Sequence, residues 1–165
     1  MVPPMATAIY PGSFDPVTRG HVHVVERGLV MFDHVTVAVG INDEKSPTFT
    51  ADERLDMLRA VLPSDDRLSI VAIDGLIADY CRAHGVNAIL RGARTMADAA
   101  TERQLALMNG HLQGSVETVV VPSMDYGYVS SSLMREVVGN GGSVSGMLHP
   151  SVEQHLQSRL HADRP

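Results

Sequence analysis

Three short stretches of this chain combine residue types that can hold and polarise phosphate groups. The stretch Tyr10–His21 contains a glycine and a serine and ends at a histidine. Arg91–Arg94 places two arginines around a glycine, and Ser130–Ser132 is a run of three hydroxyls. Guanidinium groups match phosphate oxygens in charge and geometry, while hydroxyl and imidazole groups can donate hydrogen bonds to them. These residue types therefore suit chemistry on a polyanionic ligand.

The stretch Tyr10–His21 (YPGSFDPVTRGH) follows a short apolar run, Ala6–Tyr10, that predicts a strand. Gly12 and the flanking prolines are expected to interrupt regular structure, and a helix is expected to begin near His21. A strand, a glycine-containing loop and a helix N-terminus together direct backbone N–H groups and the helix dipole at a phosphate. Ser13 can add a hydroxyl donor, and His21 either an N–H or an imidazolium. The alternative is an ordinary loop between a strand and a helix.

The arginine and serine stretches each have a simpler explanation as well. Gly92 would let a ligand approach the backbone closely, but Arg91 and Arg94 could also belong to a solvated surface turn. Ser130 can cap a helix, and capping needs only one hydroxyl. The other two hydroxyls become useful where free N–H groups at a helix N-terminus surround a pyrophosphate.

Composition limits the classes of protein to which the chain can belong. Its 165 residues fit one domain, residues 1–165. The net charge of −6 without a basic tract argues against a nucleic-acid surface. No apolar run approaches the ~20 residues that cross a bilayer, and the N-terminus carries no secretory signal, so no membrane partner is expected. The single cysteine, Cys81, fits a reducing cytoplasm.

Histidines are numerous, but their spacing predicts no metal site in the protein. His21 and His23 would point about 200° apart around a helix and cannot chelate one ion together. The chain has no HExxH motif and no cysteine pair, and it has no GxSxG motif to mark a nucleophile.

Apolar runs alternate with helical patterns along the whole chain. Strands are expected at Ala6–Tyr10, His34–Ile41, Leu68–Ile73, Val86–Leu90 and Thr118–Val121. Helices are expected at Arg19–Phe32, Thr50–Leu62, Leu76–His84, Thr95–Leu112 and Ser130–Val138, with a last one from Pro150. This order predicts an α/β fold with a Rossmann-like, doubly wound, parallel five-stranded sheet.

Such sheets bind ligands beyond the carboxyl ends of their strands. Ser13, the segment Asn42–Lys45, the pair of arginines around Gly92 and the segment after Val121 all follow predicted strands. Residues scattered over the sequence are therefore expected to converge on one edge of the sheet.

Two motifs resemble the signatures of the nucleotidyltransferase superfamily. Thr18-Arg19-Gly20-His21 resembles its (T/H)xGH element, and Ser130–Ser132 together with Arg135 resembles its second signature. With Phe14-Asp15-Pro16 before Thr18, and with Arg91-Gly92-Ala93-Arg94 close to RGLR, the chain is similar to the phosphopantetheine adenylyltransferases from Tyr10 to about Leu160. The resemblance implies transfer of AMP from ATP to 4′-phosphopantetheine, giving dephospho-CoA and pyrophosphate, with Mg²⁺ on the phosphates. It also implies a homohexamer that binds CoA.

The resemblance further implies roles for individual residues. His21 would stabilise the transition state, helped by Ser13, Lys45 and Arg91. The residues implied to bind ATP are Ser13, Phe14, His21, Gly92, Ala93, Arg94, Glu102, Tyr126, Gly127, Tyr128, Val129, Ser130, Ser131 and Ser132. The residues implied to bind phosphopantetheine are Ser13, Lys45, Ile77, Arg91 and Asn109.

The chain departs from the family's pattern in one neighbourhood. Ala93 replaces a leucine, and Asp98-Ala99-Ala100-Thr101-Glu102 stands where the family has DFEYE. We expect this region to be incompletely buried in the monomer and to face the ligand or a partner subunit. The alternatives are a catalytically attenuated ATP- or CoA-binding module, or another adenylyltransferase such as the nicotinate-mononucleotide type.

Overall fold

The computed structural model describes residues 5–41, 46–113 and 116–162. Lys45, for which the sequence predicts a substrate-binding role, lies outside the described residues. Among those residues no helix is both long and apolar enough to cross a membrane.

Five parallel strands form one sheet in the order β3-β2-β1-β4-β5. The strands are β1 (Thr7–Gly12), β2 (His34–Ile41), β3 (Leu68–Asp74), β4 (Ala88–Ala93) and β5 (Glu117–Pro122). Since the chain starts at the centre, winds to one edge and returns to build the other, the sheet is doubly wound. The predicted fold class is confirmed.

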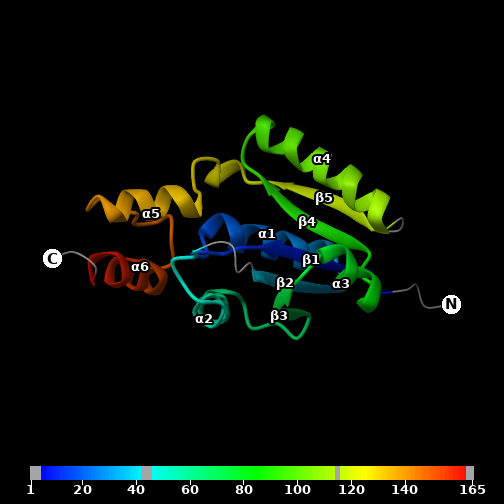
Figure 1. Ribbon diagram of the computed structural model, residues 1–165, viewed down its shortest axis with the longest axis horizontal. Coiled ribbons are helices and arrows are strands. Elements are labelled where there is room, and N and C mark those ends of the chain that lie inside the picture. Colours follow the sequence, from blue (N-terminus) through cyan, green and yellow to red (C-terminus); the bar gives the residue numbers. More distant parts are fainter. Residues whose placement is uncertain (1–4, 42–45, 114–115, 163–165) are drawn as a thin grey trace.

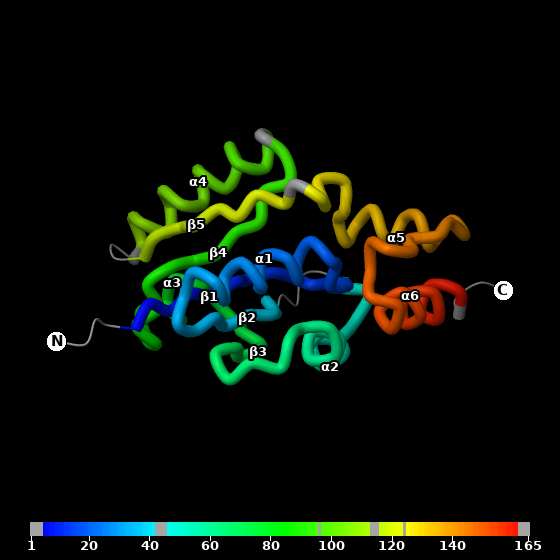
Figure 2. The backbone as a smooth tube through the Cα atoms, turned by 180° about the vertical axis from the view of Figure 1, so that it is seen from behind, coloured from blue at the N-terminus to red at the C-terminus, as the bar shows by residue number. Residues whose placement is uncertain are grey.

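Helices cover both faces of the sheet and its carboxyl end (Figure 1). They are α1 (Arg19–Met31), α2 (Ala51–Val61), α3 (Ile77–His84), α4 (Met96–Gln113), α5 (Ser131–Gly139) and α6 (Pro150–Ala162), with the short 3₁₀ helix η1 (Met124–Tyr126) before α5. α1 packs on β2 and β4, and α2 packs on β2 and β3, while α4 packs on β4 and β5 and contacts α3. Figure 2 shows α5 and α6 side by side beyond the strands, at the end of the molecule opposite the N-terminus.

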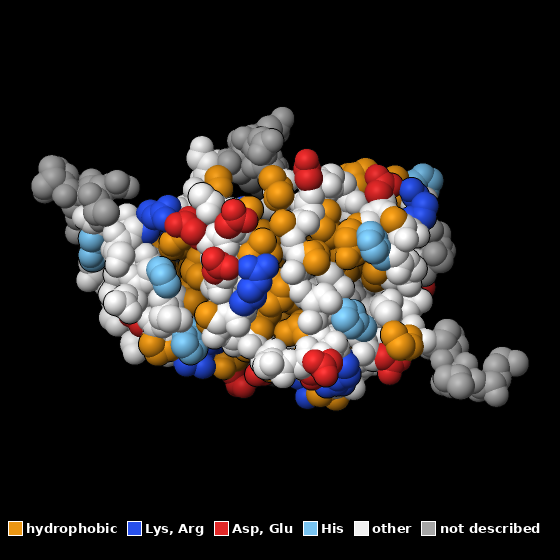
Figure 3. All heavy atoms as spheres, turned by 90° about the horizontal axis from the view of Figure 1, so that it is seen from below, with side chains coloured by type: hydrophobic (Ala, Val, Ile, Leu, Met, Phe, Trp, Pro, Cys, Tyr) orange, Lys and Arg blue, Asp and Glu red, His pale blue; other side chains and the backbone are white. Residues whose placement is uncertain are grey.

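Alternate residues of the central strands face two separate hydrophobic clusters. Tyr10 and Leu90 face a large cluster shared with α1, α2, α5 and α6, whereas Ile9 and Ile89 face a smaller one that includes Cys81 of α3. Side chains alternate in this way because successive residues of a strand point to opposite faces. The face of the molecule on the side of α2 and β3 carries hydrophobic side chains with charges of both signs among them (Figure 3).

The two central strands β1 and β4 run two and three residues further at their carboxyl ends than the sequence predicts. β1 continues through Pro11 and Gly12, where a break was expected, and β4 continues through Arg91 and Ala93. At Pro11 the strand pairs with β2, while its pairing with β4 is confined to Ala8 and Ile9. The two central strands therefore separate toward their carboxyl ends. Arg91 lies within a strand and not in the turn after it.

Candidate active site

The separation of β1 and β4 creates the position at which a doubly wound sheet binds its ligands. After β1 the chain continues into β2 and β3 on one side of β1, and it returns later to form β4 on the other side. The connections that follow β1 and β4 therefore lead in opposite directions and leave the gap between these two strands uncovered. Nη1 of Arg91 spans the gap and donates to the carbonyl oxygen of Pro11 at 3.3 Å. The stretches that the sequence singles out lie around this gap.

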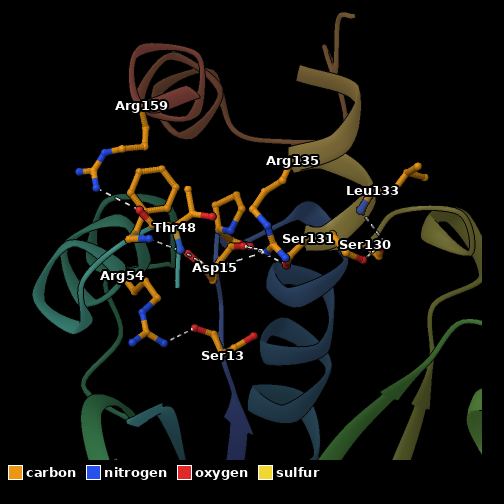
Figure 4. Close-up of polar contacts among 12 residues, drawn as sticks. Ser13, Asp15, Thr48, Arg54, Ser130, Ser131, Leu133, Arg135 and Arg159 are labelled. Carbon is orange, nitrogen blue, oxygen red and sulfur yellow. Dashed lines mark hydrogen bonds and ion pairs between the residues drawn. The ribbon is translucent and has the colours of Figure 1, made fainter. Parts of the chain in front are cut away.

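The loop that follows β1 is held by contacts from distant segments. Asp15 is a buried residue, only 6% exposed, and its side chain accepts hydrogen bonds from the backbone N–H groups of Thr48 and Phe49, each at 2.9 Å. Arg135 of α5 donates to the backbone carbonyl of Asp15 and lies 3.7 Å from its carboxylate. Figure 4 shows these groups converging from α5, from the loop and from the segment before α2. The loop is thus fixed before any ligand arrives.

Phe14 occupies the tight part of this loop with a positive φ of 48° and a fully buried ring. The ring makes edge-on contacts with Tyr10 and His21, with centroids 5.4 and 5.0 Å away. A Cβ on Gly12 would lie 2.8 Å from the ring, so a residue with a side chain would displace it. Phe14, predicted to bind ATP, therefore has its side chain in the core, where it supports His21.

His21 is held in one tautomer by the start of α1. Thr18 caps the helix, and its backbone N–H donates to Nδ1 of His21 at 3.0 Å, completing a capping box. Because Nδ1 accepts this bond, the ring proton of the neutral imidazole sits on Nε2. Burial, assisted by the positive charge of Arg94, lowers the pKa of His21 to about 4. Of the two forms that the sequence allows, the structure favours the neutral N–H donor.

Tyr10 lies beside His21, with ring centroids 6.3 Å apart. Burial raises the pKa of its phenol above the ordinary value, so the hydroxyl keeps its proton and can only act as a neutral hydrogen-bonding group.

The arginines of β4 and of the turn after it are each paired with an acidic residue of α4. Arg91 binds Glu102 through Nε at 2.6 Å and Nη2 at 3.0 Å, while Nε of Arg94 lies 3.2 Å from Asp98. Arg91 faces α4 because strand residues alternate between faces. Gly92 faces α1, where a Cβ would lie 3.1 Å from Val24. A side chain at this position would therefore press against Val24, where α1 packs on the strand.

The three serines before and within α5 have different contacts. Ser130 caps α5 by accepting from the N–H of Leu133 at 3.2 Å. Ser131 donates to the carbonyl of Pro16 at 2.8 Å and so ties α5 to the loop after β1 (Figure 4). The Ser132 hydroxyl lies 3.3 Å from that of Ser130. One serine caps the helix, a second fixes the loop, and the third is available to a ligand.

Two neighbouring cavities open at this site, with volumes of about 390 and 640 Å³. They share a wall that contains Gly12, Ser13, Arg91 and Arg135. The smaller cavity adds His21, Gly92, Arg94, Glu102, Tyr126, Val129 and the three serines. The larger one adds Gly40, Arg54, Ile77, Leu105 and Asn109. Most residues predicted to bind ATP thus line the smaller cavity, Ile77 and Asn109 of the predicted phosphopantetheine set line the larger one, and Ser13 and Arg91 line both.

Some predicted site residues line neither cavity, and others were not foreseen. The side chain of Phe14 is buried, Gly127 and Tyr128 lie outside the linings, and Ala93 is buried with 9% exposure. The expectation that Ala93 would not be fully buried is therefore wrong, because β4 extends through it. Arg54, which lines the larger cavity, was missed because its sequence context marks only an amphipathic helix after a capping box.

Comparison with known proteins gives consistent results. Residues 9–137 match the cytidylyltransferase-like family. The phosphopantetheine adenylyltransferase of Anaeromyxobacter dehalogenans strain 2CP-C is 46% identical over 93% of this chain and 94% of its own. That of Heliobacterium modesticaldum is 45% identical over 90% and 89%. A putative nicotinate-nucleotide adenylyltransferase from Vibrio parahaemolyticus shares the fold, with a TM-score of 0.68 at 17% identity over 97% of each chain.

Proposed function

This chain belongs to the phosphopantetheine adenylyltransferases, within the cytidylyltransferase-like family, and from that premise we propose how its two cavities carry out the reaction. It is a nucleotidyltransferase that transfers AMP from ATP to 4′-phosphopantetheine, giving dephospho-CoA and pyrophosphate. The nicotinate-mononucleotide alternative is not favoured, because the likeness to those enzymes is one of fold at 14–17% identity.

The observation that carries the proposal is the pair of cavities with a shared cationic wall. ATP would occupy the smaller cavity, with its phosphates toward Ser13 and the N-terminus of α5. Phosphopantetheine would occupy the larger one, with its phosphate toward Arg91 and its pantetheine arm along Ile77 and Leu105. Lys45, which follows β2 in the sequence, would add a cation. The shared wall then lies where the two substrates must meet.

The reaction needs alignment and charge stabilisation more than it needs a base. An oxygen of the phosphopantetheine phosphate attacks the α-phosphorus of ATP, and the bond from that phosphorus to the oxygen that leads to the β-phosphate breaks. Pyrophosphate leaves with the bond electrons. A phosphate monoester is already ionised at neutral pH, since its second pKa is about 6. Nε2–H of His21 would donate to the α-phosphate as negative charge develops on it.

Mg²⁺ would enter with the nucleotide. Among residues 5–41, 46–113 and 116–162 no group of three or more histidine, cysteine or acidic side chains could hold a metal ion. Asp98 and Glu102, which line the ATP cavity, are already paired with arginines. Such a donor set fits an ion carried by phosphate oxygens, as Mg²⁺ commonly is in nucleotide enzymes. When bound, Mg²⁺ neutralises charge on the phosphates.

A pyrophosphate-release assay with ATP, Mg²⁺ and 4′-phosphopantetheine tests the reaction. We expect release only when both substrates are present, and loss of it in His21→Ala. Pantetheine without its phosphate and nicotinate mononucleotide serve as control acceptors and are expected to give none. Binding of both ligands without turnover would instead support the attenuated binding module.

We also propose a cytoplasmic homohexamer. A buried free thiol at Cys81 fits a reducing compartment. Several apolar side chains of α4 are exposed, including Leu107 at 62% and Met108 at 56%, and could be covered by other subunits. Light scattering during size-exclusion chromatography would measure the mass of the assembly, and a monomeric mass would contradict the proposal.

A further inference from the structure

Arg54 is a buried arginine of α2 that contacts three segments around the larger cavity. Its side chain belongs to a residue only 5% exposed. Nη1 donates to the carbonyl oxygens of Ser13 at 2.8 Å and of Gly40 at 3.2 Å, and Nε donates to that of Thr50 at 3.3 Å. The guanidinium thus joins the loop after β1, the end of β2 and the start of α2. Figure 4 shows it directed at Ser13.

The contact with Ser13 fixes the part of the loop that both substrates approach. The carbonyl of Ser13 belongs to the peptide plane that leads into Phe14, whose φ is positive. Holding this carbonyl fixes the plane, and with it the orientation of the loop backbone at Ser13, which lines the shared wall of the two cavities. A peptide plane free to rotate here would move donors away from the phosphates.

The charge of Arg54 is less compensated than that of the other arginines around the cavity. Arg91 is paired with Glu102, and Arg135 lies near the Asp15 carboxylate. Within the described parts of the chain, no carboxylate oxygen lies within 4.0 Å of the Arg54 guanidinium nitrogens. Carbonyl dipoles offset only part of the cost of burying a charge. The remaining positive potential reaches the cavity that Arg54 lines.

We propose that Arg54 is a positioning residue for adenylyl transfer, which orients the Ser13–Phe14 peptide and supplies positive charge to the phosphopantetheine cavity. The inference rests on the proposed function. It assigns two contributions to Arg54, one from the geometry of its hydrogen bonds and one from its charge. The three-carbonyl geometry requires the planar guanidinium fork, while the charge alone requires only a cation. Lysine and glutamine at this position therefore distinguish them.

The test compares kcat and KM of Arg54→Lys, Arg54→Gln and Arg59→Gln. Arg59 is the matched control, because it lies on the same helix but is exposed and paired with Asp56. Arg54→Lys is expected to lower kcat about tenfold, while KM for 4′-phosphopantetheine stays within about twofold. Arg54→Gln is expected to lower kcat at least as much and to raise that KM about tenfold. Arg59→Gln is expected to behave as wild type.

Thermal unfolding of each variant provides the folded fraction to which rates are normalised. A wild-type kcat in Arg54→Lys would overturn the proposal, and so would losses of kcat that vanish after this normalisation. If Arg54→Gln does not fold, Arg54→Lys decides alone. Absence of turnover in wild type would defeat the proposed function instead. Arg54 is then judged by the rise in melting temperature that 4′-phosphopantetheine produces. A rise kept in Arg54→Lys and lost in Arg54→Gln supports the role, and equal rises in all proteins contradict it.

Discussion

His21 shows how neighbouring residues fix one side chain in the position that its proposed role requires. The capping bond from Thr18 selects the tautomer, and the ring of Phe14 supports the imidazole from the side. A donor held in place in this way need not reorganise as charge develops on the α-phosphate. At the scale of single residues, the candidate site thus contains side chains whose rotation is restricted by contacts with their neighbours.

Replacing His21 by alanine should lower kcat by about 10²–10³-fold, the usual effect of removing one such donor. Affinity for ATP should change little, because the remaining contacts of the cavity persist. Steady-state kinetics with ATP titration would measure both. His21→Gln retains a side chain that can complete the capping box, so an equal loss in that variant would show that the imidazole itself is needed. Near-wild-type turnover in His21→Ala would refute the assignment.

The low pKa of His21 also predicts how stability varies with pH. The folded protein holds the imidazole neutral down to pH about 4, whereas the unfolded chain protonates it near its ordinary value of 6.5. Between these values the unfolded state binds more protons, so the free energy of unfolding falls as pH is lowered from 6.5 to 4. Denaturant unfolding of the ligand-free protein should show a shallower fall in His21→Gln. Identical slopes would contradict the burial of a neutral imidazole.

The division of the site into two cavities can be tested with one residue from each. Arg94 lines only the smaller cavity and Asn109 only the larger. Arg94→Ala should weaken ATP binding about tenfold or more and phosphopantetheine binding much less, since charged hydrogen bonds contribute about 1.5–3 kcal/mol. Asn109→Ala should show the reverse preference with a smaller loss. Calorimetry with each ligand measures both, and equal losses in both variants would argue against separate cavities.

At the scale of elements, α6 is linked to the active-site loop through the segment before α2. Arg159 of α6 pairs with Glu53, donates to the carbonyl of Thr48 at 3.0 Å and lies 5.1 Å from the centroid of the Phe49 ring. The same segment donates its N–H groups to Asp15. A helix remote from the cavities therefore contributes to the position of the loop.

Removing the Arg159 side chain should affect the candidate site, although Arg159 lines neither of its two cavities. Arg159→Ala is expected to raise KM for 4′-phosphopantetheine about threefold and to leave KM for ATP nearly unchanged, because Thr48 and Phe49 precede α2 on the side of the larger cavity. Arg82→Ala, which removes an exposed pair with Asp79 on α3, is the control. An equal rise in both KM values would indicate general destabilisation and not a local link.

The elements themselves could be predicted from sequence, including both ends of β2, but the carboxyl ends of β1 and β4 could not. Apolar runs and the capping box of α2 depend on neighbouring residues, so local patterns reveal them. The end of β1 depends instead on its partners, since Pro11 remains in the strand where β2 still pairs with it. Arg54 and Ser13 lie 41 residues apart, and no local pattern marks such a contact. Motifs indicated the residues of the candidate site, whereas the contacts that support these residues required the structure.

At the scale of the whole molecule, the alanine-rich region that runs from the end of β4 into the start of α4 has a buried part and an exposed part. Ala93 is buried in the strand, whereas Ala100 and Thr101 are exposed on α4 and Ala99 is half-buried. The expected incomplete burial is thus confirmed for Ala99, Ala100 and Thr101 of the helix, and it is wrong for Ala93 of the strand and for Glu102, which is buried. The two parts should respond differently when the family's larger residues are restored.

Ala93→Leu is expected to overpack the strand and to lower the free energy of unfolding by about 1–3 kcal/mol. Ala99→Phe with Thr101→Tyr should change monomer stability little and favour assembly or substrate binding, because these side chains can meet a partner or ligand. Thermal unfolding, light scattering and calorimetry would measure the three effects. A double variant that melts much higher, yet binds and assembles as before, would contradict this prediction.

The contacts that fix the loop after β1 also affect the order in which parts of the protein fold during its synthesis. Ser131 and Arg135 meet Pro16 and Asp15 across 115 and 120 residues, and Arg159 meets Thr48 across 111. Contacts between such distant parts form late, because they close long loops. During synthesis the first signature emerges from the ribosome long before its supports do. A nascent chain that ends before α5 would lack the Ser131 and Arg135 contacts, and the active site becomes complete only as the last two helices dock.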